Sequence, residues 1–123
     1  MFTPCYRLVL SFICMTLFLS WVPSVQAEEK HPAETAGLKS GESEIETSIK
    51  FVNKSKQTIK VYWINFEGER ETRKTVKDGE TYEVSTTYLT HPWLITDEKE
   101  NAWYIYFPDA QPRTVEVVAP EKK

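Results

Sequence analysis

Two tryptophans, a threonine and a histidine are the residues whose types and spacing could do chemistry in this chain. Trp63 stands inside an apolar run, and Thr87 and His91 come shortly before Trp93. Aromatic walls with a few placed hydrogen-bonding groups are typical of pockets that bind small or extended ligands. The pattern therefore favours a binding site. A tryptophan in a strand is more often part of the core, and that alternative stays open.

Catalysis and metal binding lack the residues that they need. After residue 27 the chain contains no cysteine and two histidines, His31 in a polar segment and His91 in a loop. No G-x-S-x-G nucleophile elbow is present. One histidine in the folded part leaves a zinc site short of nitrogen ligands. We therefore expect neither an enzyme nor a metal or cofactor site.

The charge pattern argues against a nucleic-acid partner. The chain carries 15 Lys and Arg against 18 Asp and Glu, a formal net charge of -3. The two signs are interspersed, whereas a nucleic-acid surface needs a basic stripe or patch. We expect an ordinary charged surface and a peptide or protein partner.

The first 27 residues have the layout of a secretory signal peptide. A short segment with one positive charge, Arg7, precedes an uncharged apolar run over residues 8–22. Val25 and Ala27 then stand where a signal peptidase requires small residues. We expect cleavage after Ala27 and a secreted, periplasmic or extracellular protein. An uncleaved signal anchor, which would attach the protein to a membrane, is the alternative.

The remaining chain divides by composition. Residues 28–42 are polar and carry few large apolar side chains, so we expect a flexible leader. Residues 43–120 follow a period of two, which is typical of half-buried strands, and residues 121–123 are a tail. Ile45, Ile49 and Phe51 are expected on the inner face of the first strand. The predicted strands are residues 44–53, 58–66, 70–76, 81–86, 93–96, 102–107 and 114–118.

The strand pattern predicts an all-β fold, an antiparallel sandwich or barrel. Both faces of residues 58–66 carry bulky side chains, so this strand is expected to be central. The charges of residues 70–76 are typical of a strand at a sheet edge.

Three runs of the sequence resemble the β domain of the von Hippel–Lindau tumour suppressor family. They are IKVYWINFEGE, DGETYEV and TYLTHPWLITD, with a further echo in YFP at residues 106–108. The similarity covers about residues 51–108. It implies a seven-stranded antiparallel β-sandwich that binds an extended peptide containing hydroxyproline.

The resemblance also implies roles for particular residues. Trp63 and Trp93 would be aromatic walls, and His91 would be a partner of the ligand hydroxyl. Thr87 stands where the family has serine. The chain has one extra residue between Gly79 and His91, so Thr86 is the alternative to Thr87.

Two departures from the family pattern change what is expected. Arg73 replaces a tyrosine of the family pocket, and its guanidinium could instead reach a ligand carbonyl. Tyr62, Tyr82 and Tyr88 are candidates for the missing ring. The chain ends at Lys123 without a helical domain, so we expect no elongin and no ubiquitin ligase as partners. A structural or interaction protein without a working pocket remains the alternative function.

Overall fold

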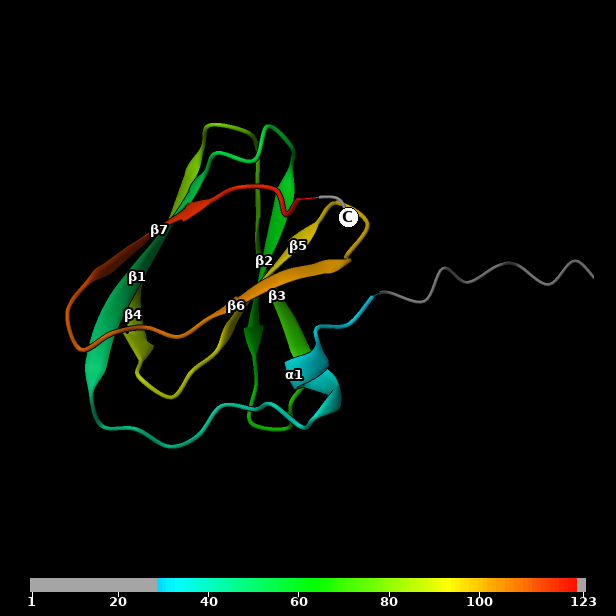
Figure 1. Ribbon diagram of the computed structural model, residues 1–123. Helices are drawn as coiled ribbons and strands as arrows, with labels where there is room; N and C mark the ends of the chain where they lie inside the picture. The colour runs from blue at the N-terminus through cyan, green and yellow to red at the C-terminus, as the bar shows by residue number, and fades with distance from the viewer. Residues whose placement is uncertain (1–28, 122–123) are drawn as a thin grey trace, which may run out of the picture.

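The computed structural model describes residues 29–121, which form two β-sheets packed face to face (Figure 1). The predicted all-β, seven-stranded sandwich is confirmed. The predicted signal peptide and the last two residues of the predicted tail lie outside the described residues. The elements are α1 (Pro32–Thr35), β1 (Glu46–Asn53), β2 (Ile59–Ile64), β3 (Arg70–Val76), β4 (Thr81–Tyr88), β5 (Trp93–Asp97), β6 (Ala102–Tyr106) and β7 (Arg113–Val117).

The larger sheet has the order β3-β2-β5-β6, so β2 is central and β3 is an edge, as predicted. Along β2, Ile59 and Val61 face the other sheet and are fully buried. Tyr62 and Ile64 face the outside of the sandwich and are also buried. Both faces of this strand are covered, which explains why its sequence has bulk at nearly every position.

The smaller sheet has the order β4-β1-β7 and contains one parallel pair, β1 with β7. This pair departs from the wholly antiparallel sandwich that was predicted. Between β6 and β7 the chain crosses from the larger sheet to the smaller one. No hairpin joins β1 to β7, so the antiparallel direction that a hairpin imposes does not apply.

The core lies between the two sheets and is mostly β-branched and aromatic. Ile49 and Phe51 of β1 are buried in it as predicted. The prediction for Ile45 is wrong, because this residue precedes β1 and is 52% exposed. Asn53, in a sequence of the type N-x-S, is also fully buried. Its amide nitrogen donates to the carbonyl oxygens of Gln57 and Val76.

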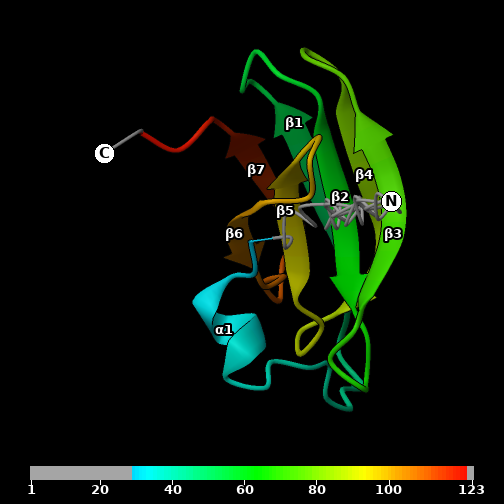
Figure 2. The same cartoon turned by 90° about the vertical axis from the view of Figure 1, so that its right-hand side faces the viewer.

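The segment predicted to be a flexible leader is packed against the sandwich. Figure 2 shows α1 beside the larger sheet and the chain running from it below the sheets towards β1. His31 caps α1, accepting from the Ala33 backbone N–H, while Glu34 accepts from the His31 N–H. The expectation of a leader without packed structure is therefore corrected. The contacts that hold it come from residues distant in sequence, which composition cannot show.

An ion pair holds the leader to the outer face of the larger sheet. The Arg70 guanidinium donates to both carboxylate oxygens of Glu34 over 2.8 and 2.9 Å, and both side chains are largely buried. Arg70 also donates to the Glu100 carbonyl oxygen. Burial would raise the pKa of Glu34, but the hydrogen bonds from Arg70 and the His31 backbone, with the Arg70 charge, leave that pKa lowered.

The leader then passes close to the β2–β3 turn. Leu38 packs over the outer-face cluster of Tyr62, Ile64 and Leu94. Ser40 bonds to the Asn65 and Ile64 carbonyl oxygens. A Cβ on Gly68 would meet the Leu38 carbonyl oxygen at 2.9 Å, and the φ of Gly68 is +80°. Only glycine fits here without strain.

Three β-bulges interrupt the regular alternation of the strands. Arg73 is the extra residue of β3 opposite β2, because Val61 pairs with Lys74 and Tyr62 with Thr72. Trp103 is the extra residue of β6 opposite β5. In β4 the extra residue lies at 85–86. A bulge re-aims the side chains around it and often lies next to a binding site.

None of the helices within residues 29–121 is long and apolar enough to span a membrane.

Candidate binding pocket

A hollow of about 260 Å³ opens between the two sheets on the side of β3 and β4, and we call it the Trp63 pocket. All six residues predicted as site residues line it. Strands of both sheets contribute, so the pocket exists only when the sandwich is assembled. Its lining residues are Trp63, Arg73, Tyr82, Val84, Thr86, Thr87, Tyr88, His91 and Trp93.

The two tryptophans are neighbours on the inner face of the larger sheet. Trp63 of β2 and Trp93 of β5 are paired directly across the strands. Trp93 is only 4% exposed and packs against Phe51, with ring centroids 6.2 Å apart. Trp63 is half-buried. Trp93 is thus the floor of the pocket, whereas Trp63 reaches its mouth.

The bulge in β4 decides which threonine faces the pocket floor. Ile49 pairs with Val84 and Thr47 with Thr87, so β4 contains one residue more than β1 over this stretch. Thr87 consequently faces inward and is 2% exposed, while Thr86 is exposed on the rim. The Trp93 Nε1–H donates to Thr87 Oγ1 over 3.1 Å. The structure therefore places Thr87, not Thr86, at the floor.

Arg73 covers the ring of Trp63. The second bulge brings its guanidinium to 5.0 Å from the Trp63 ring centroid, the geometry of a cation–π contact. The same guanidinium pairs with Glu71 at 3.2 Å, and both of these side chains are well exposed. Arg73 thus places a charged group over this ring, and its exposed ion pair with Glu71 holds it only weakly, because surface ion pairs contribute little.

His91 sits among three aromatic rings. Its ring centroid lies 5.2 Å from Tyr88, 5.4 Å from Trp63 and 5.4 Å from Phe66. The leader supports the loop that carries His91, because the Gly41 N–H donates to the Thr90 carbonyl and the Thr90 hydroxyl donates to the Gly41 carbonyl. Burial among these groups lowers the pKa of His91, opposed by a hydrogen bond with the Gly41 backbone. The lowered pKa favours the neutral form of the imidazole.

One polar atom of the pocket has no hydrogen-bond partner in the part of the chain that the structure describes. Trp63 Nε1 is buried and has no hydrogen-bond acceptor among residues 29–121. A buried N–H without an acceptor costs about 1–3 kcal/mol relative to a paired one. A ligand that brings an oxygen to this atom would recover that cost. The pocket thus offers apolar ring faces, a donor on Trp63, a hydroxyl on Thr87 and a neutral imidazole.

Phe66 is a residue of this site that sequence reasoning missed. It is 47% exposed and meets Trp63 edge-on, with ring centroids 5.6 Å apart. Its place in the run IKVYWINFEGE, which resembles the family, was the signal that could have found it. Of the three tyrosines considered for the missing ring, Tyr82 and Tyr88 line the pocket. Tyr62 lies on the opposite face, where burial and its hydrogen bond to Glu100 raise its pKa to about 12.

Asn65, which follows Trp63 closely, contributes to the turn and not to the pocket. Its side-chain oxygen accepts the backbone N–H groups of Glu67 and Glu69 at 3.0 and 2.8 Å. These bonds order the turn that carries Phe66.

Within the part of the chain that the structure describes, no group of His, Cys, Asp and Glu side chains could hold a metal ion.

The fold and the hollow place this chain among small β-sandwich domains that have an aromatic pocket between their sheets. Comparison with known families identifies which one. The model of the VHL beta domain matches residues 38–106, more than half of the 123-residue chain. This chain belongs to the VHL β-domain family. The match begins at Leu38, so it includes the last part of the leader that packs on the sandwich.

A solved structure titled "NMR structure of the protein from Eubacterium rectale" is similar to this chain with 17% sequence identity and a TM-score of 0.36. The alignment covers 63% of this chain and 84% of that one. The search of curated proteins finds no match.

Proposed function

We propose that this protein is a recognition module that binds an extended peptide through a proline residue, with hydroxyproline as the preferred form. The observation that carries the proposal is the convergence of Trp63, Thr87, His91 and Trp93 on one hollow. These residues come from three strands and a loop. Membership of the VHL β-domain family supports a protein- or peptide-binding role.

The polar groups of the pocket match a ligand hydroxyl. Thr87 Oγ1 accepts from Trp93, so its own O–H is left to donate to a ligand oxygen. The neutral His91 has one ring nitrogen that can accept, so the same hydroxyl can donate to it. A ligand without the hydroxyl would leave these groups desolvated and unpaired, which is how such a site rejects it.

Two N–H-bearing side chains of the pocket favour a peptide as the ligand. The Trp63 Nε1–H lacks an acceptor within the described residues, and a backbone carbonyl oxygen would supply one. The Arg73 guanidinium lies over the same ring and has further N–H groups that can reach a second carbonyl. A proline ring packed between Trp63 and Tyr88 would present its neighbouring carbonyls to these donors.

The proposal includes export and excludes catalysis. The predicted signal over residues 1–27 would deliver the protein to the extracellular or periplasmic space. Its ligands would then be extracellular chains, with no nucleic acid, cofactor or ubiquitin-ligase partner. N-terminal sequencing of protein recovered from the medium or periplasm tests this, because export predicts a chain beginning at Glu28. Recovery of the uncleaved chain in a membrane fraction would contradict it.

Calorimetry with matched peptides tests the ligand. A peptide with a central hydroxyproline should bind about tenfold or more tightly than its proline counterpart, since one unpaired buried polar group costs 1–3 kcal/mol. His91→Ala should abolish the difference, and Thr87→Ser should keep it. Equal binding of both peptides would remove the hydroxyproline claim. Binding of neither would remove the peptide claim.

A purely structural role is the second candidate, and two observations favour it. Trp93 is nearly buried, and Arg73 already covers Trp63. Under this alternative the tryptophans are core residues only. Arg73→Ala separates the two roles. It should uncover Trp63 and change ligand affinity if the pocket binds, but it should change nothing measurable if the pocket is only structural.

A further inference from the structure

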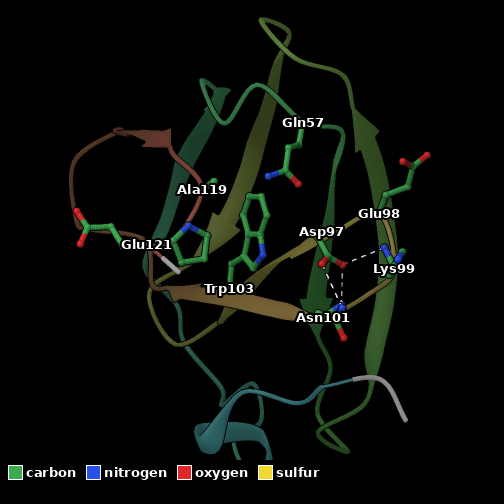
Figure 3. Close-up of a pocket in the computed structure, with 9 residues that line it drawn as sticks. Gln57, Asp97, Glu98, Lys99, Asn101, Trp103, Ala119 and Glu121 are labelled. Atoms are coloured by element: carbon green, nitrogen blue, oxygen red, sulfur yellow. Dashed lines mark hydrogen bonds between the residues drawn. The ribbon is translucent and has the colours of Figure 1, made fainter. Parts of the chain in front are cut away.

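A second and larger hollow, of about 500 Å³, lies at the other end of the sandwich, and we call it the Trp103 hollow. Its position follows from the register of β2 and β5, since Ile59 pairs with Asp97 at this end while Trp63 pairs with Trp93 at the other. Figure 3 shows the Trp103 indole in the middle of the hollow, with Gln57 and Asp97 at its margins. The lining residues are Gln57, Asp97, Glu98, Lys99, Asn101, Trp103, Ala119, Pro120 and Glu121.

A bulge places Trp103 in this hollow. Trp103 is the extra residue of β6, because Ile95 pairs with Tyr104 and Thr96 with Ala102. Consecutive side chains of a regular strand point to opposite faces. Here both Trp103 and Tyr104 pack against the core between the sheets. The bulge thus turns a large ring towards the open end of the sandwich, just as the other two bulges supply Arg73 and Thr87 to the Trp63 pocket.

Within the described residues, three aromatic rings of this protein are covered by a cation, and the ring of Trp103 is not one of them. Arg70, Arg73 and Arg113 each place a guanidinium over an aromatic ring, at 5.0 to 5.6 Å from the centroids. The rings that they cover are Tyr62, Trp63 and Tyr106. Within residues 29–121, Trp103 makes no ring–ring contact and has no cation over it.

Among the described side chains that line the hollow, carboxylates outnumber ammonium groups. Three carboxylates line the hollow, those of Asp97, Glu98 and Glu121, against the single ammonium of Lys99. Asp97 accepts hydrogen bonds from the backbone N–H groups of Lys99 and Asn101 and from the Asn101 amide. These donors are neutral, and within the described residues Asp97 has no ion pair. No cationic side chain of the described residues is therefore paired with this carboxylate at the margin of the hollow.

We propose that the Trp103 hollow binds a basic side chain, arginine above all, presented by a partner polypeptide. A guanidinium can stack on the indole and donate to carboxylates at its margin at the same time, which an ammonium point charge cannot do. An arginine of the partner on Trp103 would make the same kind of contact that Arg73 makes on Trp63 within this chain. This site is independent of the Trp63 pocket, since no residue lines both.

The test compares two peptides that differ only in charge. Acetyl-Gly-Arg-Gly-amide and its citrulline counterpart have nearly the same shape, but citrulline is neutral. In ¹H–¹⁵N spectra of the labelled protein, the arginine peptide should shift the Trp103 indole N–H signal in a saturable way. The citrulline peptide should not, and added salt should weaken the effect because the contact is exposed. The Trp63 signal serves as the internal control and should stay in place.

Charge variants on a single turn refine the test. Glu98→Gln and Lys99→Gln are neighbouring, exposed substitutions of opposite sign. The first should weaken binding of the arginine peptide by about 2–5-fold and the second should strengthen it, as expected for exposed charge contacts. Trp103→Phe should weaken binding while keeping most of the packing.

Three results would overturn the proposal. They are an unmoved Trp103 signal, an equal response to the citrulline peptide, or a response to a neutral methyl glucoside in place of the arginine peptide. The last would make the hollow a sugar site. These results would leave the hydroxyproline experiment unaffected, because that experiment is read by calorimetry and its variants lie at the other end of the sandwich.

Discussion

The Trp63 pocket and the Trp103 hollow lie at opposite ends of one sandwich and are built from different parts of it. The pocket is lined mainly by strand residues whose side chains also pack in the core, such as Trp93 and Val84. The hollow is lined mainly by turn residues and by the segment after β7, with Trp103 as its single core contact. In the pocket, binding and stability depend on the same side chains, whereas in the hollow they are largely separate.

The largest expected effect is the loss of the pocket floor. Trp93→Ala should lower the free energy of unfolding by about 3–5 kcal/mol, because it removes a buried ring that packs on Phe51. Trp103→Ala is the matched control at the other end and should cost clearly less, since that ring is half-exposed. Urea denaturation of both variants measures the difference. Equal losses of unfolding free energy in the two variants would contradict the proposed difference between the two regions.

The leader should support the structure through its buried ion pair. Glu34→Ala removes two charge-assisted hydrogen bonds to Arg70, so we expect a loss of about 1.5–3 kcal/mol. Glu44→Ala, an exposed substitution further along the chain, should change little. Because the pKa of Glu34 is lowered on folding, its contribution to the free energy of unfolding is fully present above pH 4.5, the region of its unfolded pKa. This contribution is lost as the pH falls through the folded-state pKa. Acid unfolding that is identical in the wild type and the Glu34→Ala variant would contradict this.

The hydroxyl of Thr87 should matter more than its methyl group. Thr87→Val keeps the shape but leaves the Trp93 Nε1–H without an acceptor, at an expected cost of about 1–3 kcal/mol. Thr87→Ser keeps the hydroxyl and should cost less. Thermal denaturation gives the order of the three proteins. A valine variant as stable as the serine variant would mean that the Trp93 hydrogen bond adds nothing to stability.

His91 should make stability depend on pH near neutrality. Its folded-state pKa lies below 6.5, so the unfolded chain binds a proton more readily and stability falls as pH drops below 6.5 towards that pKa. Above 6.5 the imidazole is neutral in both states and the effect is absent. NMR titration of the ring gives the pKa directly, and His91→Gln should remove this part of the pH profile. A measured His91 pKa above 6.5 would reverse the sign and contradict this prediction.

The smallest expected effect is in the turn of the hollow. Glu98→Gln should change the free energy of unfolding by no more than about 0.5 kcal/mol, as surface substitutions usually do. The same variant is expected to weaken arginine-peptide binding. A binding change without a stability change is the signature that separates this hollow from the Trp63 pocket. A large loss of stability in Glu98→Gln would show that the residues of the hollow, like those of the Trp63 pocket, are needed for the stability of the fold.

The strands of this protein are readable from its sequence because side-chain alternation is a local property. The period of two located all seven strands, and the bulk on both faces of β2 and the charge of β3 placed those strands in the sheet. The tryptophans, Thr87 and His91 also met in one pocket as their spacing and the family resemblance had suggested.

The tertiary structure alone decided what depends on a partner strand or on a distant segment. The bulge opposite β1 chose Thr87 over Thr86, and the bulge opposite β5 turned Trp103 to the open end. The Arg70–Glu34 pair, with the contacts of Leu38 and Ser40, joins to the sandwich a leader whose composition is that of a flexible segment. A single strand cannot reveal its own bulges, since an extra residue exists only relative to the register of its neighbour. An ion pair across thirty-odd positions likewise forms only after the sheet has brought its two ends together.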